Sequence, residues 1–423
     1  GAYGYSTNTG RAYLFYNDGS IPTTAVTADV IIAGEINSGF GASLTSGDFN
    51  ADGKTDLAVG VYFYASSRGR VYIFASQNGQ VNTNVSLTGE ASSYFGHSLA
   101  SGDFNADGRT DLIVGADTYS TNTGRAYLFY NDGSLPTTAA TADVIITGEA
   151  TGNYFGRYLS AGDVNADGKT DVLIGAGSAT KAYVFYNDGS YPSLAANSDV
   201  VINGISVSNI SIGDLNTDGK QDILIAHFGY GSNGRAYLFY ADGTNNFGSV
   251  ACTGSVPTSC TGSNADIIVD GTGGKRLGAA VAGDANADGR SDMLLGGTNN
   301  TAGELYVLYN DGTSFGTAAC TTACSVTNAD VTISGENTGD NFASSIVVGD
   351  MNNDGRADIV TVAQSYSSNT GRVYFFYNDG SYPAAAGNAD SIMTGEGTAA
   401  YPFGDGLNVA DMNADGRVDL VVG

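Results

Sequence analysis

The 423-residue sequence contains no tryptophan, two histidines, four cysteines and six prolines. His97 and His227 stand alone, outside any metal or nucleophile motif, so a catalytic site built on histidine is not expected. No apolar run approaches the roughly 18 residues that a membrane-spanning helix needs. The first residues, Gly1 to Gly10, lack the charged and apolar regions of a signal peptide. We therefore expect no membrane insertion, and a chain that is soluble and already processed as given.

Basic residues are also scarce. Only 17 Lys and Arg stand against 43 Asp and Glu, which gives a formal net charge of -26. A phosphate backbone is held by clustered Lys and Arg side chains, so nucleic acid is not an expected partner. Acidity this strong calls instead for bound cations.

The four cysteines form two local pairs, Cys252 with Cys260 and Cys320 with Cys324, and both pairs lie in one type of insertion. Neither pair has a histidine nearby, so metal binding by thiolates is the weaker interpretation. Two short-range disulfides formed in an oxidising compartment are the stronger one. This predicts an extracellular or cell-surface location.

What the sequence has in abundance is repetition. Residues 5–35 and 119–149 are identical at 28 of 31 positions, and a looser unit occurs seven times. Each unit has an apolar segment ending in Asp, an acidic loop, an apolar strand such as 112–115, a polar loop, a strand such as 124–130, an Asn-Asp-Gly turn and a last strand such as 142–149. Four short strands per roughly 60 residues are typical of a β-propeller. The sequence thus predicts an all-β fold: a single seven-bladed β-propeller domain, 1–423, with four-stranded antiparallel blades.

The acidic loop follows the pattern Asp-x-Asn-x-Asp-Gly-x-x-Asp in all seven units. Side-chain oxygens at positions 1, 3, 5 and 9, with a main-chain carbonyl at position 7, are ligands that suit Ca²⁺. The five predicted ligand positions are Asp48, Asp103, Asp163, Asp214, Asp284, Asp350 and Asp411 (position 1); Asn50, Asn105, Asn165, Asn216, Asn286, Asn352 and Asn413 (position 3); Asp52, Asp107, Asp167, Asp218, Asp288, Asp354 and Asp415 (position 5); Lys54, Arg109, Lys169, Lys220, Arg290, Arg356 and Arg417 (position 7, through the carbonyl); and Asp56, Asp111, Asp171, Asp222, Asp292, Asp358 and Asp419 (position 9).

One copy of this loop would be explained as well by Asp, Asn and Gly forming a hairpin turn. Seven copies with an unbroken ligand pattern favour about seven Ca²⁺ ions, one per blade, which would reduce the formal charge from -26 to -12. The loop is similar to the first half of an EF-hand, but position 12 is not Glu and apolar strands flank it instead of helices.

A Phe-Gly pair stands eight residues before the first loop aspartate in four units, at 40–41, 95–96, 155–156 and 403–404. With the calcium pattern, this resembles the FG-GAP repeat of integrin α-subunit propellers and their bacterial relatives. The resemblance implies calcium ligands on one face of the propeller. It also implies that the connections from strand 2 to strand 3, and from strand 4 to the next strand 1, form the opposite face. Tyr-Ser-x-Asn-Thr-Gly loops at 5–10, 119–124 and 366–371 belong to that face and suit adaptable recognition. Turn residues preserved by recent duplication explain them equally well.

The blades are expected at approximately 38–92, 93–152, 153–203, 204–272, 273–338 and 339–398. The seventh is shared between 399–423 and 1–37, because the chain ends on a second strand and begins before a third. A clasp of this kind closes the ring and pairs exposed edges.

The favoured function is a non-enzymatic binding or adhesion module for a protein or glycan ligand. The alternative is a self-assembling subunit of a surface layer or extracellular filament, with copies of itself as partners. A hydrolase is the weakest hypothesis, because the aspartates are committed to identical loops in which calcium would remove them as acids.

Overall fold

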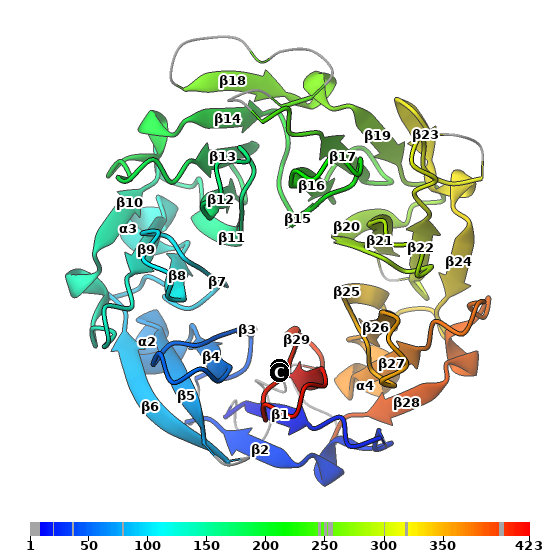
Figure 1. Ribbon diagram of the computed structural model, residues 1–423, viewed down its shortest axis with the longest axis horizontal. Helices are drawn as coiled ribbons and strands as arrows, with labels where there is room; N and C mark the ends of the chain where they lie inside the picture. Colours follow the sequence, from blue (N-terminus) through cyan, green and yellow to red (C-terminus); the bar gives the residue numbers. More distant parts are fainter. Residues whose placement is uncertain are drawn as a thin grey trace.

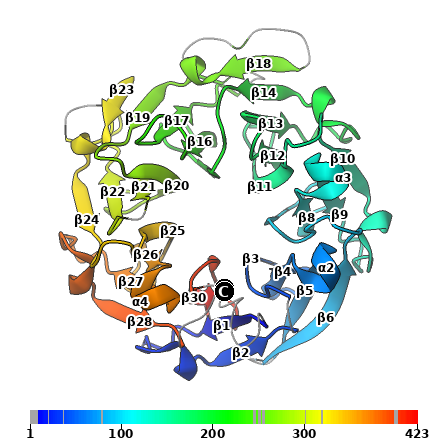
Figure 2. The ribbon, with the colours of Figure 1, turned by 180° about the vertical axis from the view of Figure 1, so that it is seen from behind.

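The computed structural model describes residues 9–19, 21–35, 38–77, 80–243, 247–248, 252, 257–299, 301–317, 320–396 and 402–423. Seven sheets are arranged as a ring about a central axis (Figures 1 and 2). The predicted all-β, seven-bladed propeller is confirmed. No helix among the described residues has the length and apolar character needed to cross a bilayer.

Four antiparallel strands make each blade, numbered here in chain order from the first complete one. The blades comprise, in turn, β3 (Ser43–Gly47), β4 (Asp56–Val61), β5 (Arg70–Gln77) and β6 (Gln80–Thr88); β7 (Leu99–Gly102), β8 (Asp111–Ala116), β9 (Arg125–Phe129) and β10 (Val144–Thr147); β11 (Phe155–Gly162), β12 (Asp171–Ala176), β13 (Lys181–Phe185) and β14 (Val200–Asn203); β15 (Asn209–Gly213), β16 (Asp222–His227), β17 (Arg235–Phe239) and β19 (Ile267–Asp270); β20 (Arg276–Gly283), β21 (Asp292–Thr298), β22 (Glu304–Leu308) and β24 (Val331–Ser334); β25 (Phe342–Gly349), β26 (Asp358–Ala363), β27 (Arg372–Phe376) and β28 (Ser391–Thr394); and β29 (Leu407–Ala410), β30 (Asp419–Val422), β1 (Arg11–Phe15) and β2 (Val30–Ala33).

The burial of the strands follows the same order in each blade. The first strands, such as β3 and β7, are half-buried because they line the central channel. Second strands such as β4 and β8 are buried at every residue, and third strands such as β9 at all but the first. Hydrophobic clusters join each blade to the next. The core is therefore a ring of packed interfaces between neighbouring sheets.

The predicted shared blade is confirmed. Strand β1 pairs antiparallel with β30, with Tyr13 opposite Val422 and Phe15 opposite Leu420, and it pairs on its other side with β2. The main-chain N–H of Asn17 donates to the carboxylate of Asp419 at 2.8 Å, which extends the clasp beyond the strands. The first and last strands of the described chain, β1 and β30, thus lie in one sheet (Figure 1).

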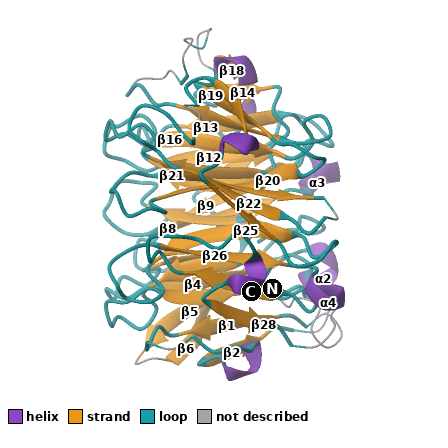
Figure 3. Ribbon diagram, turned by 90° about the vertical axis from the view of Figure 1, so that its right-hand side faces the viewer, coloured by secondary structure: helices purple, strands orange, loops and turns teal. Residues whose placement is uncertain are grey.

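Antiparallel alternation puts the strand 1–2 and 3–4 connections at one end of the blade and the 2–3 and 4–1 connections at the other. One-turn segments α2 (Tyr64–Ser67), α3 (Tyr119–Asn122) and α4 (Tyr366–Asn369) are strand 2–3 connections, and Figure 3 shows them on a single face. The strand 3–4 connections carry short 3₁₀ turns: η1 (Ala25–Thr27), η2 (Ala139–Thr141), η3 (Ala195–Asn197), η4 (Gly262–Asn264), η5 (Val326–Asn328) and η6 (Ala386–Asn388).

The cysteine insertions add a fifth strand to two blades. Strand β18 (Thr258–Thr261) leaves the fourth blade and pairs parallel with β14, the outer strand of the third. Strand β23 (Ala323–Ser325) leaves the fifth blade and pairs in the same way with β19 of the fourth.

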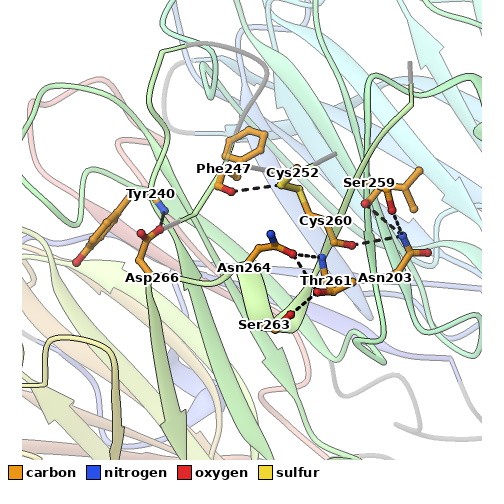
Figure 4. The surroundings of a disulfide bond; sticks show 11 residues. Asn203, Tyr240, Phe247, Cys252, Ser259, Cys260, Thr261, Ser263, Asn264 and Asp266 are labelled. Carbon is orange, nitrogen blue, oxygen red and sulfur yellow. Dashed lines mark hydrogen bonds between the residues drawn. A yellow bond between two sulfur atoms is a disulfide. The ribbon is translucent and has the colours of Figure 1, made fainter. Parts of the chain in front are cut away.

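Both predicted disulfides are present, between Cys252 and Cys260 and between Cys320 and Cys324. Figure 4 shows that Cys260 lies on β18, where its carbonyl accepts a hydrogen bond from the Asn203 amide of β14 at 3.3 Å. The first disulfide therefore holds the segment that fastens two blades together.

Candidate functional site

Each acidic loop connects the first and second strands of its blade and is organised by its own backbone. In the second blade, the main-chain N–H of Asp107 donates to the carboxylate of Asp103 and to the side-chain oxygen of Asn105, both at 3.0 Å. The N–H of Gly108 donates to the other Asp103 oxygen at 2.8 Å. The same bonds recur in all seven loops. Positions 1, 3 and 5 are thus brought to one side of a tight turn.

The turn requires left-handed backbone at two positions. Gly108 at position 6 has φ 86°, which glycine adopts freely. Position 4 is also left-handed but is never glycine; Ala106, for example, has φ 59°. The position-4 residues are Ala51, Ala106, Ala166, Thr217, Ala287, Asn353 and Ala414. An alanine in this region costs roughly 1–2 kcal/mol, so the loop is held in a strained form in the five blades whose fourth loop residue is alanine.

The ninth residue is placed differently from the other ligands. Asp111 is completely buried, and its two carboxylate oxygens accept the main-chain N–H of Phe104 at 2.9 Å and of Asn131 at 2.7 Å. Burial, and then the nearby carboxylates of Asp107 and Asp103, raise the pKa of Asp111 to about 6. Its counterparts are shifted in the same direction for the same reasons: Asp56, Asp358 and Asp419 to about 6, and Asp171, Asp222 and Asp292 to about 7.

The donor set fits a hard divalent cation in its chemistry. Three carboxylates and one amide oxygen belong to one short stretch of chain, and the carboxylates at positions 1 and 5 lie near enough to the ninth aspartate to raise its pKa. In the described ranges, however, no three His, Cys, Asp or Glu side chains converge as a ready-made metal cluster. The oxygens at positions 1, 3 and 5 instead accept hydrogen bonds from loop N–H groups. Each carboxylate oxygen has a second lone pair, so an amide and a cation can share it.

The loops are also joined from blade to blade. Asn131 lies two residues after the end of β9. Its side-chain amide donates to the carbonyl of Asp48 in the preceding blade at 3.2 Å, and its main-chain N–H donates to the carboxylate of Asp111. The equivalent bond joins Asn187 to the carbonyl of Asp103, Asn310 to that of Leu215 and Asn17 to that of Asp350. In the fourth blade the acceptor, Leu215, is the second residue of the loop, whereas the other acceptors are the first. The basic residue at position 7 supports this turn in four blades, as Arg109 does by donating to the Asn131 carbonyl at 3.2 Å. The sequence analysis missed this asparagine, although the recurring Tyr-Asn-Asp-Gly turn marked it.

These contacts separate two kinds of aspartate by their effect on stability. Asp111→Ala should lower the free energy of unfolding by about 2–6 kcal/mol even in excess chelator, because it leaves two buried amides without an acceptor at about 1–3 kcal/mol each. Asp107→Ala, in the exposed part of the same loop, should change it by less than about 1 kcal/mol under those conditions. Urea unfolding of both variants in chelator checks this. Equal losses for the two would contradict a structural role for the ninth aspartate.

The opposite face carries the predicted Tyr-Ser loops. Ser120, Thr121 and Asn122 of α3 are all left-handed, with φ of 47°, 59° and 62°. The loops of α2 and α4 repeat this geometry, while residues 5–8 of the first predicted loop lie outside the described residues. Backbone held in sparsely populated regions clusters at functional sites.

The tyrosine of each loop is committed to the fold. The Arg125 guanidinium stacks on the Tyr119 ring at 3.7 Å and forms an ion pair with Glu90 of the preceding blade at 3.2 Å. The same arrangement involves Arg70 with Tyr64 and Glu35, and Arg372 with Tyr366 and Glu336. Recognition by these loops would therefore fall to their small polar residues.

Three cavities lie on this face. One of about 370 Å³ opens at the mouth of the central channel and is lined by residues at the start of the inner strands or directly before them, including Ser43, Ser98 and Ser208. A second, of about 470 Å³, lies between the α2 and α3 loops. The third, of about 520 Å³, lies between the third and fourth blades. Arg157 lines both the first and the third.

A cluster of charged residues that breaks the repeat stands at the channel mouth. His97 Nδ1 lies 3.1 Å and Arg157 Nη1 3.2 Å from the same oxygen of Asp117, whose side chain is fully buried. The Arg157 side chain remains 40% exposed. The adjacent hydroxyl of Ser98 donates to the carbonyl of Gly156 at 2.7 Å, so it is not poised beside His97 as a nucleophile. His227, at the end of β16, lies against Tyr230 and Tyr237 and is nearly buried.

Comparison with known proteins places these features in a family. Residues 40–74 and 95–129 match the FG-GAP repeat, and residues 163–225, 284–361 and 350–422 match the FG-GAP-like repeat. The chain is 28% identical to integrin alpha-5 of Xenopus laevis over 212 residues, which are 45% of this chain and 20% of that protein. It is 32% identical to integrin alpha-PS2 of Drosophila melanogaster over 147 residues, 32% of this chain and 10% of that protein. The matched regions thus span a fifth or less of these relatives.

Proposed function

Because the chain belongs to the FG-GAP repeat family, we propose that it is an extracellular, calcium-stabilised propeller that binds a protein or glycan ligand and catalyses no reaction. The observation that carries the proposal is the gathering of three cavities on the face away from the acidic loops. One face would hold cations and the other would hold the ligand. The two disulfides are consistent with an oxidising location.

Within the loops, positions 1, 3, 5 and 9 and the carbonyl of position 7 would hold Ca²⁺. The ion would offset the repulsion among three carboxylates and stabilise the left-handed turn. It supplies charge and rigidity, not chemistry.

On the ligand face, Arg157 is the residue best placed to make contact. Its guanidinium is anchored by buried Asp117 and opens into two cavities, in a molecule that is otherwise strongly acidic. Hydroxyls of small residues line the same cavities and suit hydrogen bonding to a glycan or to peptide groups.

The test is a binding survey of the calcium-loaded protein on a glycan array and a panel of immobilised extracellular proteins. We expect a ligand whose apparent affinity falls at least tenfold for Arg157→Ser and is unchanged for Asp132→Ser, which removes an exposed charge on the opposite face. Binding that survives Arg157→Ser but is lost with Asp132→Ser would contradict the assigned face. Absence of any ligand, together with ordered arrays in electron micrographs of the purified protein, would favour the self-assembling subunit.

A further inference from the structure

Six of the seven blades have the edge of their outer strand covered by the next blade along the chain. The covering segment is part of the strand 3–4 connection and runs parallel to the outer strand. In the first, second, fifth and sixth blades, one main-chain hydrogen bond joins the outer strand to this segment. The N–H groups of Thr88, Thr147, Ser334 and Thr394 donate to the carbonyls of Thr137, Ser193, Ala384 and Thr23, respectively. In the third and fourth blades it has grown into β18 and β23.

The seventh blade is the exception among the described residues. The blade that would cover it is the first, whose strand 3–4 connection is instead a hairpin, paired from Arg70 and Thr88 to Gln77 and Gln80. No described residue pairs with the outer edge of β2. Ile31 is 39% exposed, whereas its counterpart under β18, Val201, is 5% exposed.

The open edge presents two pairs of main-chain groups. The N–H of Gly34 donates inward to the carbonyl of Gly10, so strand alternation turns the N–H and C=O of Ile31 and Ala33 outward. Ala33 is the counterpart of Thr147, whose N–H binds Ser193 at 2.9 Å. Strand β2 reads Val-Ile-Ile-Ala and the covered β10 reads Val-Ile-Ile-Thr. Two strands of nearly identical sequence therefore differ in their outer edges: that of β10 is hydrogen-bonded to the next blade, and that of β2 is bonded to no described residue.

The covering segments share a sequence. Five of the six have proline directly before the residue that makes the first edge contact, preceded by an apolar residue and a serine: Ser20 to Thr24, Ser134 to Thr138, Ser190 to Leu194, Ser255 to Ser259 and Ser381 to Ala385. The apolar residue packs inward, as Leu135 and Tyr191 do. No charged residue occurs in any of these segments.

A cavity of about 220 Å³ adjoins the open edge between the seventh and first blades, and it is lined by Ile32, Ala33, Gly34, Glu35, Phe40, Tyr72 and Phe74. In the covered first blade, Thr138 bridges Thr88, the counterpart of Ala33, and the next residue, Ala139, is buried in one cluster with the counterparts of the three aromatic rings. The cavity therefore corresponds to the place of the small residue that follows the first edge contacts. An edge that can extend a sheet and an adjoining side-chain cavity are the two parts of a strand-addition site, where main-chain bonds give affinity and a side-chain pocket gives specificity.

We propose that the outer edge of β2 binds an extended segment of a partner polypeptide with the pattern Ser-apolar-Pro followed by two uncharged residues, added parallel to the strand. A second copy of the chain is disfavoured as the occupant, because its own segments of this pattern are already bonded within its ring. Pairing of β2 with another β2 about a two-fold axis would be antiparallel, unlike the six covered edges.

The test uses the full chain with calcium and a fluorescent peptide of residues 190–198, the segment that covers β10. Fluorescence anisotropy should show saturable binding, weakened at least tenfold by Ala33→Pro, which deletes the outward N–H. Proline is tolerated on an edge strand, so the variant should keep its melting temperature. Val26→Ser, which changes a nearby residue that is 58% exposed and outside β2, should bind like the parent.

Equal binding of the peptide to the Ala33→Pro protein, or no saturation in the millimolar range, would overturn the proposal. So would a dimer in analytical ultracentrifugation that Ala33→Pro abolishes, because the edge would then be occupied by a second copy. A peptide with the same residues in scrambled order should bind at least tenfold more weakly. If it binds equally well, the pattern has no role.

Discussion

In excess chelator, the protein is expected to melt at a temperature lower by on the order of 20 °C than in millimolar calcium. Each loop held at a hundredfold excess of Ca²⁺ over its Kd would contribute about 2.7 kcal/mol to stability, and seven such contributions act on one ring. The physical reason lies in the loops themselves. Three carboxylates repel one another around a turn whose fourth residue is held in the left-handed region. Calorimetry with and without chelator measures the difference.

A pair of charge-matched variants isolates one site. Asp107→Ala removes a proposed ligand from the second blade, and calcium titration should then find about six sites in place of about seven. Asp132→Ala removes the same charge from an exposed turn of that blade and should leave the titration unchanged. Identical melting curves with and without chelator would contradict calcium stabilisation altogether.

The features that could be predicted from sequence are those that the repeat displays locally. Seven copies of a nine-residue loop fixed the number of blades, and the half-unit at each end predicted the shared blade, because strand order within the unit was already known. The disulfide pairs were predictable because Cys252 and Cys260, like Cys320 and Cys324, are close in the chain.

What could not be predicted depends on contacts between blades. The stack of Arg125 on Tyr119, and its ion pair with Glu90 of another blade, join three residues with no pattern that marks them as partners. The fifth strands β18 and β23 arise because an insertion reaches the edge of a neighbouring sheet. The cluster of His97, Asp117 and Arg157 consists of single departures from the repeat, for which a periodic analysis has no signal.

The ninth loop aspartate shows how one residue can satisfy two patterns. Its spacing predicted a metal ligand, yet Asp111 is buried and binds the N–H groups of Phe104 and Asn131. The same carboxylate thus ties the loop to the third strand of the blade. Because the side chain of Asn131 in turn donates to the carbonyl of Asp48, hydrogen bonds connect the loop of the first blade to that of the second.

Opening the clasp is expected to be more damaging than emptying a loop. A chain that lacks residues 1–36 loses both β1 and β2, which leaves the seventh blade with β29 and β30 alone, and it loses the buried side chains of Tyr13, Leu14 and Phe15. Large-to-small changes at such positions cost about 2–5 kcal/mol each, so losing these three side chains alone should cost about 6–15 kcal/mol, which is comparable to the whole stability of a typical domain. The deletion also removes Thr23, which covers the edge of β28. We expect cooperative thermal unfolding, followed by circular dichroism, to be lost.

Two controls distinguish an open ring from a damaged chain. A circular permutant that joins Gly423 to Gly1 and places the new ends between residues 152 and 153 keeps every strand, so it should melt cooperatively. Leu14 in the clasp and Leu128 in the second blade are aligned by the internal duplication, and both are buried. If β1 completes the seventh blade in solution, Leu14→Ala and Leu128→Ala should each lower the free energy of unfolding by about 2–5 kcal/mol. A silent Leu14→Ala beside a destabilising Leu128→Ala would mean that the ring is closed without β1, since only an unpacked strand leaves a buried leucine without effect.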